Sequence, residues 1–531
     1  MMRFLPVNLN ALLVELDDLT QTLALLASLQ DEPLAGIEEL VPAARTLLVR
    51  FRLGVASHAE LARRIGQRDL TQPVERVGTR VEIPVDYDGE DLDEVAQLLQ
   101  LTRADVIALH TGSDYTVAFT GFAPGFGYLS GGHPRLNVPR RSTPRTRIPA
   151  GAVGLAGRFS GVYPRASPGG WQIIGVTATP MWDLSRAVPA LLQPGFRVRF
   201  VDAAQQPRSS AVPVAAPIRP AAAPERPPSG GAALEVRRTG LQALFQDLGR
   251  HGQVAQGVSS SGALDQGALR VANRLVGNPS HSAGVEIVGG GFEVVSRGAV
   301  VVAITGADLP IQLTTGTPPL GTWAMPGYQA IALADGDRLT LGEPRAGVRA
   351  YLAVRGGFAV APVLGSCATD TLAGLGPAPL AVGDVLPVQP VTRGGVVGLP
   401  EQPPADLPTT AQIVVLDVVL GPRTDWFTAE AVALLARQLW TVTPQSNRVG
   451  LRLHGAAPLT RRQRAELPSE GTTLGAIQVP PNGQPVLFLA DHPLTGGYPV
   501  IGAVAPHHLD RAGQIPVHAR VRFNPIRPFD F

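Results

Sequence analysis

Apolar and polar positions in the first 200 residues follow two periods. Alternation with a period of two predicts strands at residues 11–16, 46–51 and 80–87. A period near 3.6 predicts helices at about 17–29, and at 57–65, 91–100 and 102–111. Asp18 and Ser57 are suited to the starts of the first two helices. From Tyr115 to Asp202 only strand and turn signals remain, so this part is predicted to be β throughout.

Beyond residue 232 the pattern is almost all strands and turns. Two helices are predicted, at 263–277 and at 424–438, the second with Thr428 or Thr424 near its cap. Four segments share a similar alternating strand: 194–202, 335–343, 382–390 and 517–525. In the first three a glycine turn precedes the strand. We interpret them as strands that each close a small barrel, with chance similarity as the alternative.

One stretch has no periodic apolar face. Ala203–Ala232 is rich in proline, alanine and serine, a composition that is typical of linkers because it buries too little surface to offset its ordering entropy. The chain of 531 residues therefore divides into a half of about 200 and a half of about 300 residues.

Composition excludes several chemistries. The chain has no lysine, so all 45 of its Lys and Arg residues are arginine, which GC-rich coding explains. A lysine-bearing P-loop, Schiff-base catalysis, a lysine-held pyridoxal cofactor and covalent biotin on this chain are thereby excluded. The single cysteine, Cys367, excludes an internal disulfide and fits a cytoplasmic location. We expect no signal peptide, because the N-terminus lacks a basic region and acidic residues interrupt it early, and no membrane span, because no run of about 18 apolar residues exists. We expect no nucleic-acid partner, because the net charge is only +2 and aromatic residues are sparse.

A glycine loop followed by arginines is the first candidate binding element. In GFAPGFGYL, Gly121 and Gly125 allow close backbone approach to a ligand, and a turn at Gly170 continues the pattern. Paired guanidinium groups downstream suit bidentate capture of carboxylate or phosphate: Arg140, Arg145 and Arg147. The alternatives are a tight surface connection and a solvated basic loop.

The second half supplies the candidate acids and further polar groups. Asp265, Asp308, Glu470 and Asp491 are predicted catalytic residues, any of which could act as a base if burial raises its pKa. Further predicted binding residues lie at turns: Asp247, Arg250, Gln445, Arg448, Thr495, Gly496, Gly497 and Tyr498. Helix capping alone would explain Asp265, and a hairpin loop would explain the last four. No metal site is predicted, since the ten histidines lack a ligand spacing and His507–His508 is a bare pair.

Three motif blocks together resemble a known family. FTGFAPGFGYL…TPRTRIPAGAVGLAG…SPGGWQIIG is similar to the first subunit of the allophanate-hydrolase or sporulation-kinase-inhibitor family. TGLQALFQDLGRHG…GVSSSGALDQGALRVANRLVGN and PQSNRVGLRL…SEGTTLGAIQVPPNGQPVLFLAD…TGGYP are similar to its second subunit. Both resemble the B and C subunits of bacterial ATP-dependent 5-oxoprolinase and the carboxyltransferase region of biotin-dependent urea carboxylase, here fused in B–C order.

The resemblance implies a mainly β fold with α/β elements, in which cyclophilin-like β-barrels follow a small α/β domain. The domains expected are a small α/β domain at 1–80, a cyclophilin-like barrel at 81–202, the linker at 203–232, and barrels at 233–400 and 401–531. In many relatives a lysine follows TGGYP, whereas here position 500 is Val500 and Pro493–Leu494 precede the motif. A mechanism that relies on this lysine does not carry over.

The resemblance implies three functions. The first is an ATP-dependent opening of 5-oxo-L-proline to L-glutamate, with ATP, an open role for magnesium, and a separate lactam-utilisation-type subunit. The second is a carboxyltransferase for urea or a related amide, and the third a module that inhibits a histidine kinase. A homo-oligomer is left open.

The placement of donors and acids predicts one composite site. Because donors lie in the first half and acids in the second, we expect the site where the halves meet, with two separate barrel pockets as the alternative. Arg145→Ala or Arg147→Ala is expected to lower activity with little loss of stability.

Overall fold

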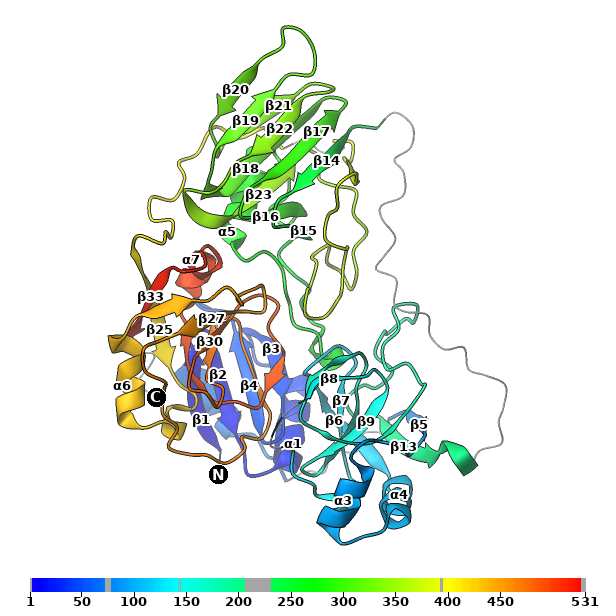
Figure 1. Ribbon diagram of the computed structural model, residues 1–531. Helices are drawn as coiled ribbons and strands as arrows, with labels where there is room; N and C mark the ends of the chain where they lie inside the picture. Colours follow the sequence, from blue (N-terminus) through cyan, green and yellow to red (C-terminus); the bar gives the residue numbers. More distant parts are fainter. Residues whose placement is uncertain are drawn as a thin grey trace.

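The computed structural model describes residues 2–71, 78–141, 143, 145–205, 231–391 and 395–526. Figure 1 shows them as an upper part, built from the strands β14–β24, above a lower part in which the N-terminal sheet lies beside the last barrel. The fold is mainly β with a few helices, as predicted. Among the described helices, none has the length and apolar character needed to cross a bilayer.

The N-terminal domain is a four-stranded sheet with two helices. The sheet order is β1-β2-β4-β3. The elements are β1 (Arg3–Asn8), β2 (Ala11–Glu15), α1 (Leu19–Asp31), β3 (Ile37–Pro42), β4 (Thr46–Phe51) and α2 (His58–Gly66). The predicted caps are confirmed, since Asp18 accepts from the N–H of Gln21 at 2.9 Å and Ser57 from that of Glu60 at 3.3 Å.

A seven-stranded sheet forms the second domain, in the order β12-β9-β10-β7-β6-β13-β5. A bridge between Asp86 and Val176 joins its two edge strands, so the sheet closes on itself. Its strands are β5 (Arg80–Val85), β6 (Tyr115–Thr120), β7 (Gly127–Ser130), β9 (Ala152–Ala156), β10 (Phe159–Val162), β12 (Gln172–Val176) and β13 (Arg197–Asp202). The other elements are α3 (Leu92–Leu99), α4 (Arg103–Thr111), η1 (Pro134–Leu136), β8 (Arg145–Ile148) and β11 (Ser167–Gly169).

The second half begins with two sheets around a common apolar core. One has the order β20-β19-β22-β17-β14-β24: β14 (Ala233–Thr239), β17 (Phe292–Arg297), β19 (Ile311–Thr314), β20 (Thr322–Met325), β22 (Arg338–Leu341) and β24 (Val385–Pro387). The other has the order β15-β16-β23-β18-β21: β15 (Gln242–Gln246), β16 (Gly284–Val288), β18 (Val300–Asp308), β21 (Ala330–Leu333) and β23 (Ala346–Val354). α5 (Gln266–Leu275) packs on the second sheet, and η3 (Val254–Gln256) precedes it.

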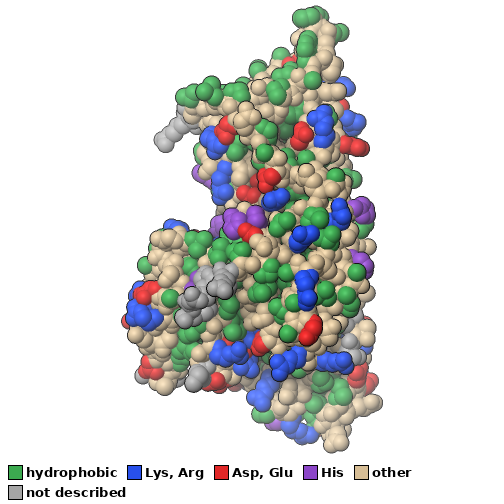
Figure 2. Space-filling view, turned by 90° about the vertical axis from the view of Figure 1, so that its left-hand side faces the viewer, with side chains coloured by type: hydrophobic (Ala, Val, Ile, Leu, Met, Phe, Trp, Pro, Cys, Tyr) green, Lys and Arg blue, Asp and Glu red, His purple; other side chains and the backbone are tan. Residues whose placement is uncertain are grey.

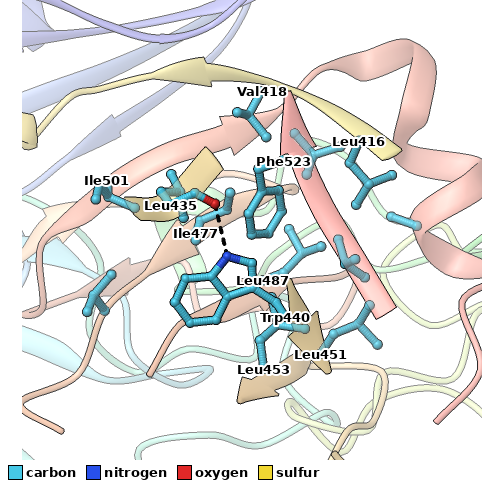
Figure 3. Packing of buried hydrophobic residues seen from close by; sticks show 14 of the residues in the cluster. Leu416, Val418, Leu435, Trp440, Leu451, Leu453, Ile477, Leu487, Ile501 and Phe523 are labelled. Carbon is cyan, nitrogen blue, oxygen red and sulfur yellow. Dashed lines mark hydrogen bonds between the residues drawn. The ribbon is translucent and has the colours of Figure 1, made fainter. Parts of the chain in front are cut away.

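The last domain is a closed barrel in the order β25-β32-β29-β30-β27-β26-β33. Its strands are β25 (Ile413–Leu420), β26 (Trp440–Val442), β27 (Gly450–His454), β29 (Ala476–Gln478), β30 (Val486–Phe488), β32 (Val500–Val504) and β33 (Arg520–Ile526). β28 (Glu470–Gly471) pairs with β31 (Thr495–Gly496), and the helices are η4 (Thr424–Trp426), α6 (Ala429–Arg437), η5 (Pro506–His508) and α7 (Leu509–Gly513). Figure 3 shows its core, in which the buried Trp440 indole donates to the carbonyl oxygen of Leu435 at 2.9 Å.

The predicted barrel-closing strands are confirmed at two of four places. β13 pairs in parallel with β5, and β33 in parallel with β25, so the last strand of each barrel closes on its first. β22 instead lies between β17 and β19 inside an open sheet, and β24 is an edge strand beside β14. These two predictions were wrong because a glycine turn before an alternating strand occurs in any antiparallel sheet. Most of the predicted linker, residues 206–230, lies outside the described residues, and Ala203–Gln205 form a short 3₁₀ turn, η2.

The N-terminal sheet packs against the last barrel, far away in the sequence (Figure 1). The amide of Asn8 donates to the carbonyl oxygen of Val504 at 2.9 Å. Arg423 of the barrel forms buried ion pairs with Glu470 and, at 3.0 Å, with Glu15 of β2. An apolar cluster continues this contact: Val7, Ala11, Leu13, Val41, Leu48 and Leu494. The two halves of the chain are therefore joined by buried contacts.

Candidate functional site

The glycine loop between β6 and β7 lies against the second half of the chain. The N–H of Phe122 donates to Oγ1 of Thr495 at 3.1 Å, and the N–H of Gly125 donates to the carbonyl oxygen of Gln256 at 2.9 Å. Gly125 has a φ of +77°, which glycine adopts without strain. A Cβ on Gly121 would lie 2.6 Å from Cγ2 of Thr495. The glycines allow the two halves to approach, where the sequence alone suggested approach to a ligand.

Gly121→Ala is expected to destabilise the chain by about 1–3 kcal/mol, since the new methyl group overlaps Thr495 and turning that side chain breaks its bond to Phe122. Thermal unfolding would measure the loss. Gly66→Ala is the matched control, because the nearest atoms to a Cβ there are 3.9 Å away. An unchanged melting temperature for Gly121→Ala would contradict close packing at this contact.

Two residues of these motifs have left-handed backbone conformations without being glycine. Phe122 has a φ of +65° and Ser261 a φ of +54°. Such conformations cost of order 1–3 kcal/mol and cluster at functional sites. Ser261 also donates to Oδ1 of the buried Asp491 at 2.7 Å. The surroundings of Phe122 and Ser261 thus hold both residues in strained backbone conformations.

Asp491 and Arg448 form a buried network between the two parts of the second half. Arg448 donates to Asp491 at 3.1 Å and also pairs with Glu286 on β16. Burial lowers the pKa of Arg448, but its two carboxylate partners outweigh this and hold the pKa above its ordinary value. Burial likewise raises the pKa of Asp491, and Arg448 outweighs it, so the net shift is downward. Both residues are fully paired, which suits a positioning role.

The loop of residues 366–371 is anchored at both ends by carboxylates. Asp247 accepts from Oγ of Ser366 at 2.7 Å and from the N–H of Cys367 at 2.6 Å. Asp491 accepts from the N–H of Thr371 at 2.8 Å and from its hydroxyl at 2.7 Å. Asp370 lies between these anchors, so its position is fixed.

Asp370 is the most unusual carboxyl group of this region. It is 1% exposed, and its Oδ1 accepts from the N–H of Ala373 at 2.7 Å. Among the buried side-chain atoms described, its Oδ2 is the only carboxylate oxygen without a hydrogen-bond partner. Burial raises the pKa of Asp370 to about 7, Asp491 adds to the shift, and the Ala373 N–H, Arg250 and Arg448 oppose it. A buried carboxyl group that titrates near neutral pH is suited to proton transfer.

Two arginines accompany Asp370, one from each half. Arg250 donates to the carbonyl oxygen of Ala368 at 2.5 Å, while its Nη1 has no partner among the described residues. Nη1 of Arg165, from the first half, lies 3.1 Å from where a Cβ on Gly374 would be, and its Nε is likewise buried without a described partner. We call Arg165, Arg250 and Asp370 the junction cluster. Trp182 and Ala190 of the first half pack beside it on Val258 and Leu375.

A pocket of about 500 Å³ is lined in part by Thr120, the residue before the glycine loop. Its walls come from α1, β3, the segment 193–196 and the segment 252–255, and are largely apolar. The carboxylates that reach it, Glu38 and Glu39, are paired with Arg50 at 3.1 and 3.3 Å. Because its charges are already neutralised, we place the candidate chemistry at the junction cluster instead.

Comparisons with known families cover both halves. The carboxyltransferase domain, subdomain A and B, matches residues 256–525, which is half of the chain, and subdomain C and D of that domain matches residues 2–192. The chain belongs to the carboxyltransferase-domain family. The two matches cover the second and first half respectively, so the family's A/B and C/D parts stand here in one polypeptide.

Curated members of the family match each half separately. The C subunit of 5-oxoprolinase from Escherichia coli (strain K12) is 37% identical over 293 residues, covering 55% of this chain and 90% of that protein. The B subunit of 5-oxoprolinase from Bacillus subtilis (strain 168) is 41% identical over 190 residues, covering 33% and 79%. Urea amidolyase of Saccharomyces cerevisiae is 31% identical over 316 residues, covering 55% and 17%. The crystal structure of TTHA0988 superposes with a TM-score of 0.81 at 33% identity, covering 99% of this chain and 100% of that one.

The departure from the family's motif is structural as well as chemical. Val500 begins β32, is 7% exposed and packs with Ala476 and Phe488. Leu494, which precedes TGGYP, packs against the N-terminal sheet. Position 500, where the resemblance implies a lysine, is therefore an apolar core position in this chain.

The predicted arginines mainly form ion pairs. Arg145 donates to both oxygens of Asp91, at 2.7 and 2.8 Å, and Arg141 donates to Asp91 at 2.6 Å. Asp91 is 1% exposed, and these contacts hold its pKa below the ordinary value although burial raises it. Arg140 reaches the second half, at 3.2 Å from Oγ of Ser469 and 2.8 Å from Glu466. Arg147 is exposed.

The expectation that Arg145→Ala leaves stability unchanged is therefore corrected. Its loss removes a partner from a buried carboxylate, so we expect a cost of about 1–3 kcal/mol. Arg147→Ala, at an exposed position on the same strand, is expected to stay within about 0.5 kcal/mol. Thermal melts of the two variants side by side would check this; equal melting temperatures would contradict the importance of the Asp91 pair.

The remaining predicted acids have different surroundings. Asp265 caps α5, accepting from the N–H of Ala268 at 2.8 Å, and burial together with Asp510 raises its pKa to about 6. Glu470 pairs with Arg423, and burial still raises its pKa. Asp308 is exposed, 3.6 Å from Arg345, so burial does not prepare it as a base. Their catalytic roles stay predictions.

The other predicted binding residues lie around the junction or outside it. Gly497 faces Arg140, whose Nη1 is 2.8 Å from where a Cβ would be. Tyr498 is partly exposed beneath Arg461, at 5.7 Å from the ring centroid. Gly496 pairs with Glu470 between β31 and β28. Gly170 accepts from the N–H of Arg141 at 2.8 Å, and Gln445 is exposed.

His507 and His508 are not a bare pair. With Asp417 they place three ligand atoms within 4.8 Å of one another. His507 pairs with Asp417 at 3.0 Å, and Nδ1 of His508 accepts from the N–H of Asp417 at 2.9 Å. These contacts occupy the nitrogens concerned, so we assign no metal to the group.

The face in Figure 2 shows basic and acidic side chains interspersed over most of its area.

Proposed function

We propose that this chain is the fused B and C component of an ATP-dependent 5-oxoprolinase, which opens 5-oxo-L-proline to L-glutamate with a separate partner protein. The observation that carries the proposal is that both halves resemble named 5-oxoprolinase subunits, over 90% of the C subunit and 79% of the B subunit. The buried contacts between the halves support a single working unit.

The chemistry asks for carbonyl activation and proton transfer. A lactam is stabilised by resonance, so its carbonyl must be activated, which phosphorylation by ATP, with or without magnesium, would achieve. Water must then form a bond to the activated carbonyl carbon, phosphate and the ring nitrogen must leave that carbon, and the nitrogen must gain a proton as its C–N bond breaks. Asp370, with its free oxygen and a pKa near 7, is the group best prepared for this step. The other buried carboxyl groups already have partners: Asp265 accepts a hydrogen bond, and Glu470 and Asp491 each form an ion pair with an arginine.

The test is an assay of ATP hydrolysis and glutamate formation with 5-oxo-L-proline, using the chain with and without a lactam-utilisation-type partner. We expect coupled turnover only when both proteins and the lactam are present. Absence of glutamate with every such partner would contradict the proposal.

A second candidate is a biotin-dependent carboxyltransferase acting on urea or a related amide. The match to the carboxyltransferase domain and the 31% identity to a urea amidolyase favour it. Biotin would have to arrive on another protein, since this chain has no lysine to carry it. Transfer of a carboxyl group from carboxybiotin to urea by this chain in an assay without ATP would support this candidate over the first.

A further inference from the structure

The junction cluster contains three unused polar atoms, on side chains that border the loop of residues 366–375. They are Nε of Arg165, Nη1 of Arg250 and Oδ2 of Asp370, each buried without a hydrogen-bond partner in the described part of the chain. Arg250 and Asp370 are each 1% exposed. Buried polar groups are nearly always paired, and leaving one unpaired costs about 1–3 kcal/mol. Three such atoms together indicate a site that is completed by something else.

The pKa directions of the buried arginines fall into two groups, although a lowered pKa also occurs for an ion-paired residue, Arg349, which lies 3.7 Å from Glu286. For Arg423 and Arg448, carboxylate partners outweigh the effect of burial, and the pKa is raised. For Arg165 and Arg250, burial dominates and lowers the pKa; Asp370 opposes this for both, and Asp247 and Asp491 also oppose it for Arg250. Neither arginine forms an ion pair within the described part of the chain, so a bound anion would add a charge-assisted partner.

Asp370 does not itself fill this role. Its Oδ1 is bonded to the N–H of Ala373, and its Oδ2 forms no hydrogen bond with either arginine. When protonated, its hydroxyl is a donor, so each of the three unused groups can donate a hydrogen bond. Arg165 is only partly buried, so this side of the cluster lies nearer the surface.

We propose that Arg165, Arg250 and Asp370 form a binding site for a small oxyanion. The shared chemistry is a group with two or more acceptor oxygens, supplied by the carboxylate of a small acid or by a phosphoryl group. The identification of the carboxylate with that of 5-oxo-L-proline rests on the proposed function. Neither arginine-to-anion contact depends on it.

The site can be tested by calorimetric titration of the full chain at about pH 6.5, just below the raised pKa of Asp370, where its carboxyl group is mostly protonated. The probes are 5-oxo-L-proline, 2-pyrrolidinone, which is the same lactam without the carboxylate, and inorganic phosphate. We expect 5-oxo-L-proline to bind and 2-pyrrolidinone not to bind. Arg165→Gln is expected to weaken binding roughly ten- to a hundredfold, the effect of losing a charge-assisted hydrogen bond. Arg345→Gln, an exposed arginine, should bind as the wild type does.

The outcomes separate the two proposals. Phosphate binding that Arg165→Gln abolishes, without 5-oxo-L-proline binding, assigns the site to a phosphoryl group. Binding of either anion that is equal in the wild type, Arg165→Gln and Arg250→Gln overturns the site but leaves the proposed function standing. Failure of both anions to bind the wild type also overturns it. Arginine-dependent binding without turnover in the presence of the partner refutes the proposed function and leaves the site intact. Arg250→Gln removes hydrogen bonds to backbone carbonyl oxygens and can impair folding. If this variant does not fold, the binding of Arg165→Gln compared with the wild type decides whether the site exists.

Discussion

Replacing Arg448 by methionine is expected to cost about 3–5 kcal/mol of stability. The substitution keeps most of the side-chain volume but leaves Glu286 and Asp491 buried without their shared cation, a situation that costs far more than the pair itself contributes. Arg448 also donates to the carbonyl oxygen of Gly262 at 2.6 Å, next to the strained Ser261. The loop that carries Ser261 should loosen together with the barrel contact.

The measurement is urea unfolding of the full chain, followed by tryptophan fluorescence, because Trp426 and Trp440 lie in the last barrel. Arg452→Met is the control, since Arg452 is exposed on the same strand, β27, and should change stability by less than about 0.5 kcal/mol. In the wild type Arg448 keeps the pKa of Asp491 low, so its stabilisation is present above the ordinary range of a carboxyl group and is lost at acid pH. The difference in unfolding free energy between Arg448→Met and the wild type should therefore become smaller as the pH falls. Equal unfolding free energies at neutral pH would show that the network is dispensable for stability.

Local signals predicted the elements, and tertiary contacts decided the site. Asp18, Ser57 and Thr428 cap helices as expected, because a cap and an apolar face are both encoded within a few residues. The short helix Leu509–Gly513 was missed, since one turn gives too short a period to detect.

The partners of the arginines could not be predicted from the sequence. Arg145 stands in a row of basic residues that resembles an anion site, yet its carboxylate partner Asp91 lies 54 residues away. Spacing along a strand shows that two side chains share a face, and it does not show what faces them. The close neighbour of the glycine loop could not be predicted for the same reason, since it is Thr495 of the other half.

Asp370 and Arg165 had weaker signals still. Arg165 lies just before the segment SPGGWQIIG of the first motif block, and nothing in the sequence distinguishes it from the other arginines. Asp370 lies in an irregular loop, and its burial is produced by anchors from Asp247 and Asp491 and by the packing of the first half. Burial of a loop residue depends on the whole fold, so periodicity cannot reveal it.

Asp370→Asn is expected to make the chain more stable and less active at once. The folded state raises the pKa of Asp370 from the ordinary value of 3.8 to about 7, so between these values the folded chain binds a proton that the unfolded chain has lost. Stability therefore falls as the pH rises from about 4 to 7 and stays low above it. Asparagine cannot ionise, so the variant should escape this loss, by an amount on the order of 2–4 kcal/mol at about pH 8.

Activity should move in the opposite direction. If Asp370 transfers the proton to the leaving nitrogen, its loss should lower turnover with the partner protein by about 10²–10⁴-fold. Asp114→Asn, at an exposed position, controls for the substitution itself. The melting temperatures of the wild type and both variants are measured at about pH 4.5 and pH 8, and their turnover is measured at one pH. The two variants and the wild type should differ little in stability at the lower pH.

The combination is what distinguishes a proton-transfer group from a structural one. A carboxylate that stabilised the fold would give a variant that is less stable at about pH 8, as expected for Asp91 or Asp491, whose pKa values are lowered. A raised carboxyl pKa means that the ionised group lowers the stability of the fold at neutral pH. Such a loss of stability is typical of groups that have a functional role. Asp370→Asn should also bind a small oxyanion at that pH more tightly than the wild type, because it removes the negative charge beside Arg165 and Arg250. A variant that is destabilised there, or that keeps full turnover, would show that Asp370 only completes the packing of its loop.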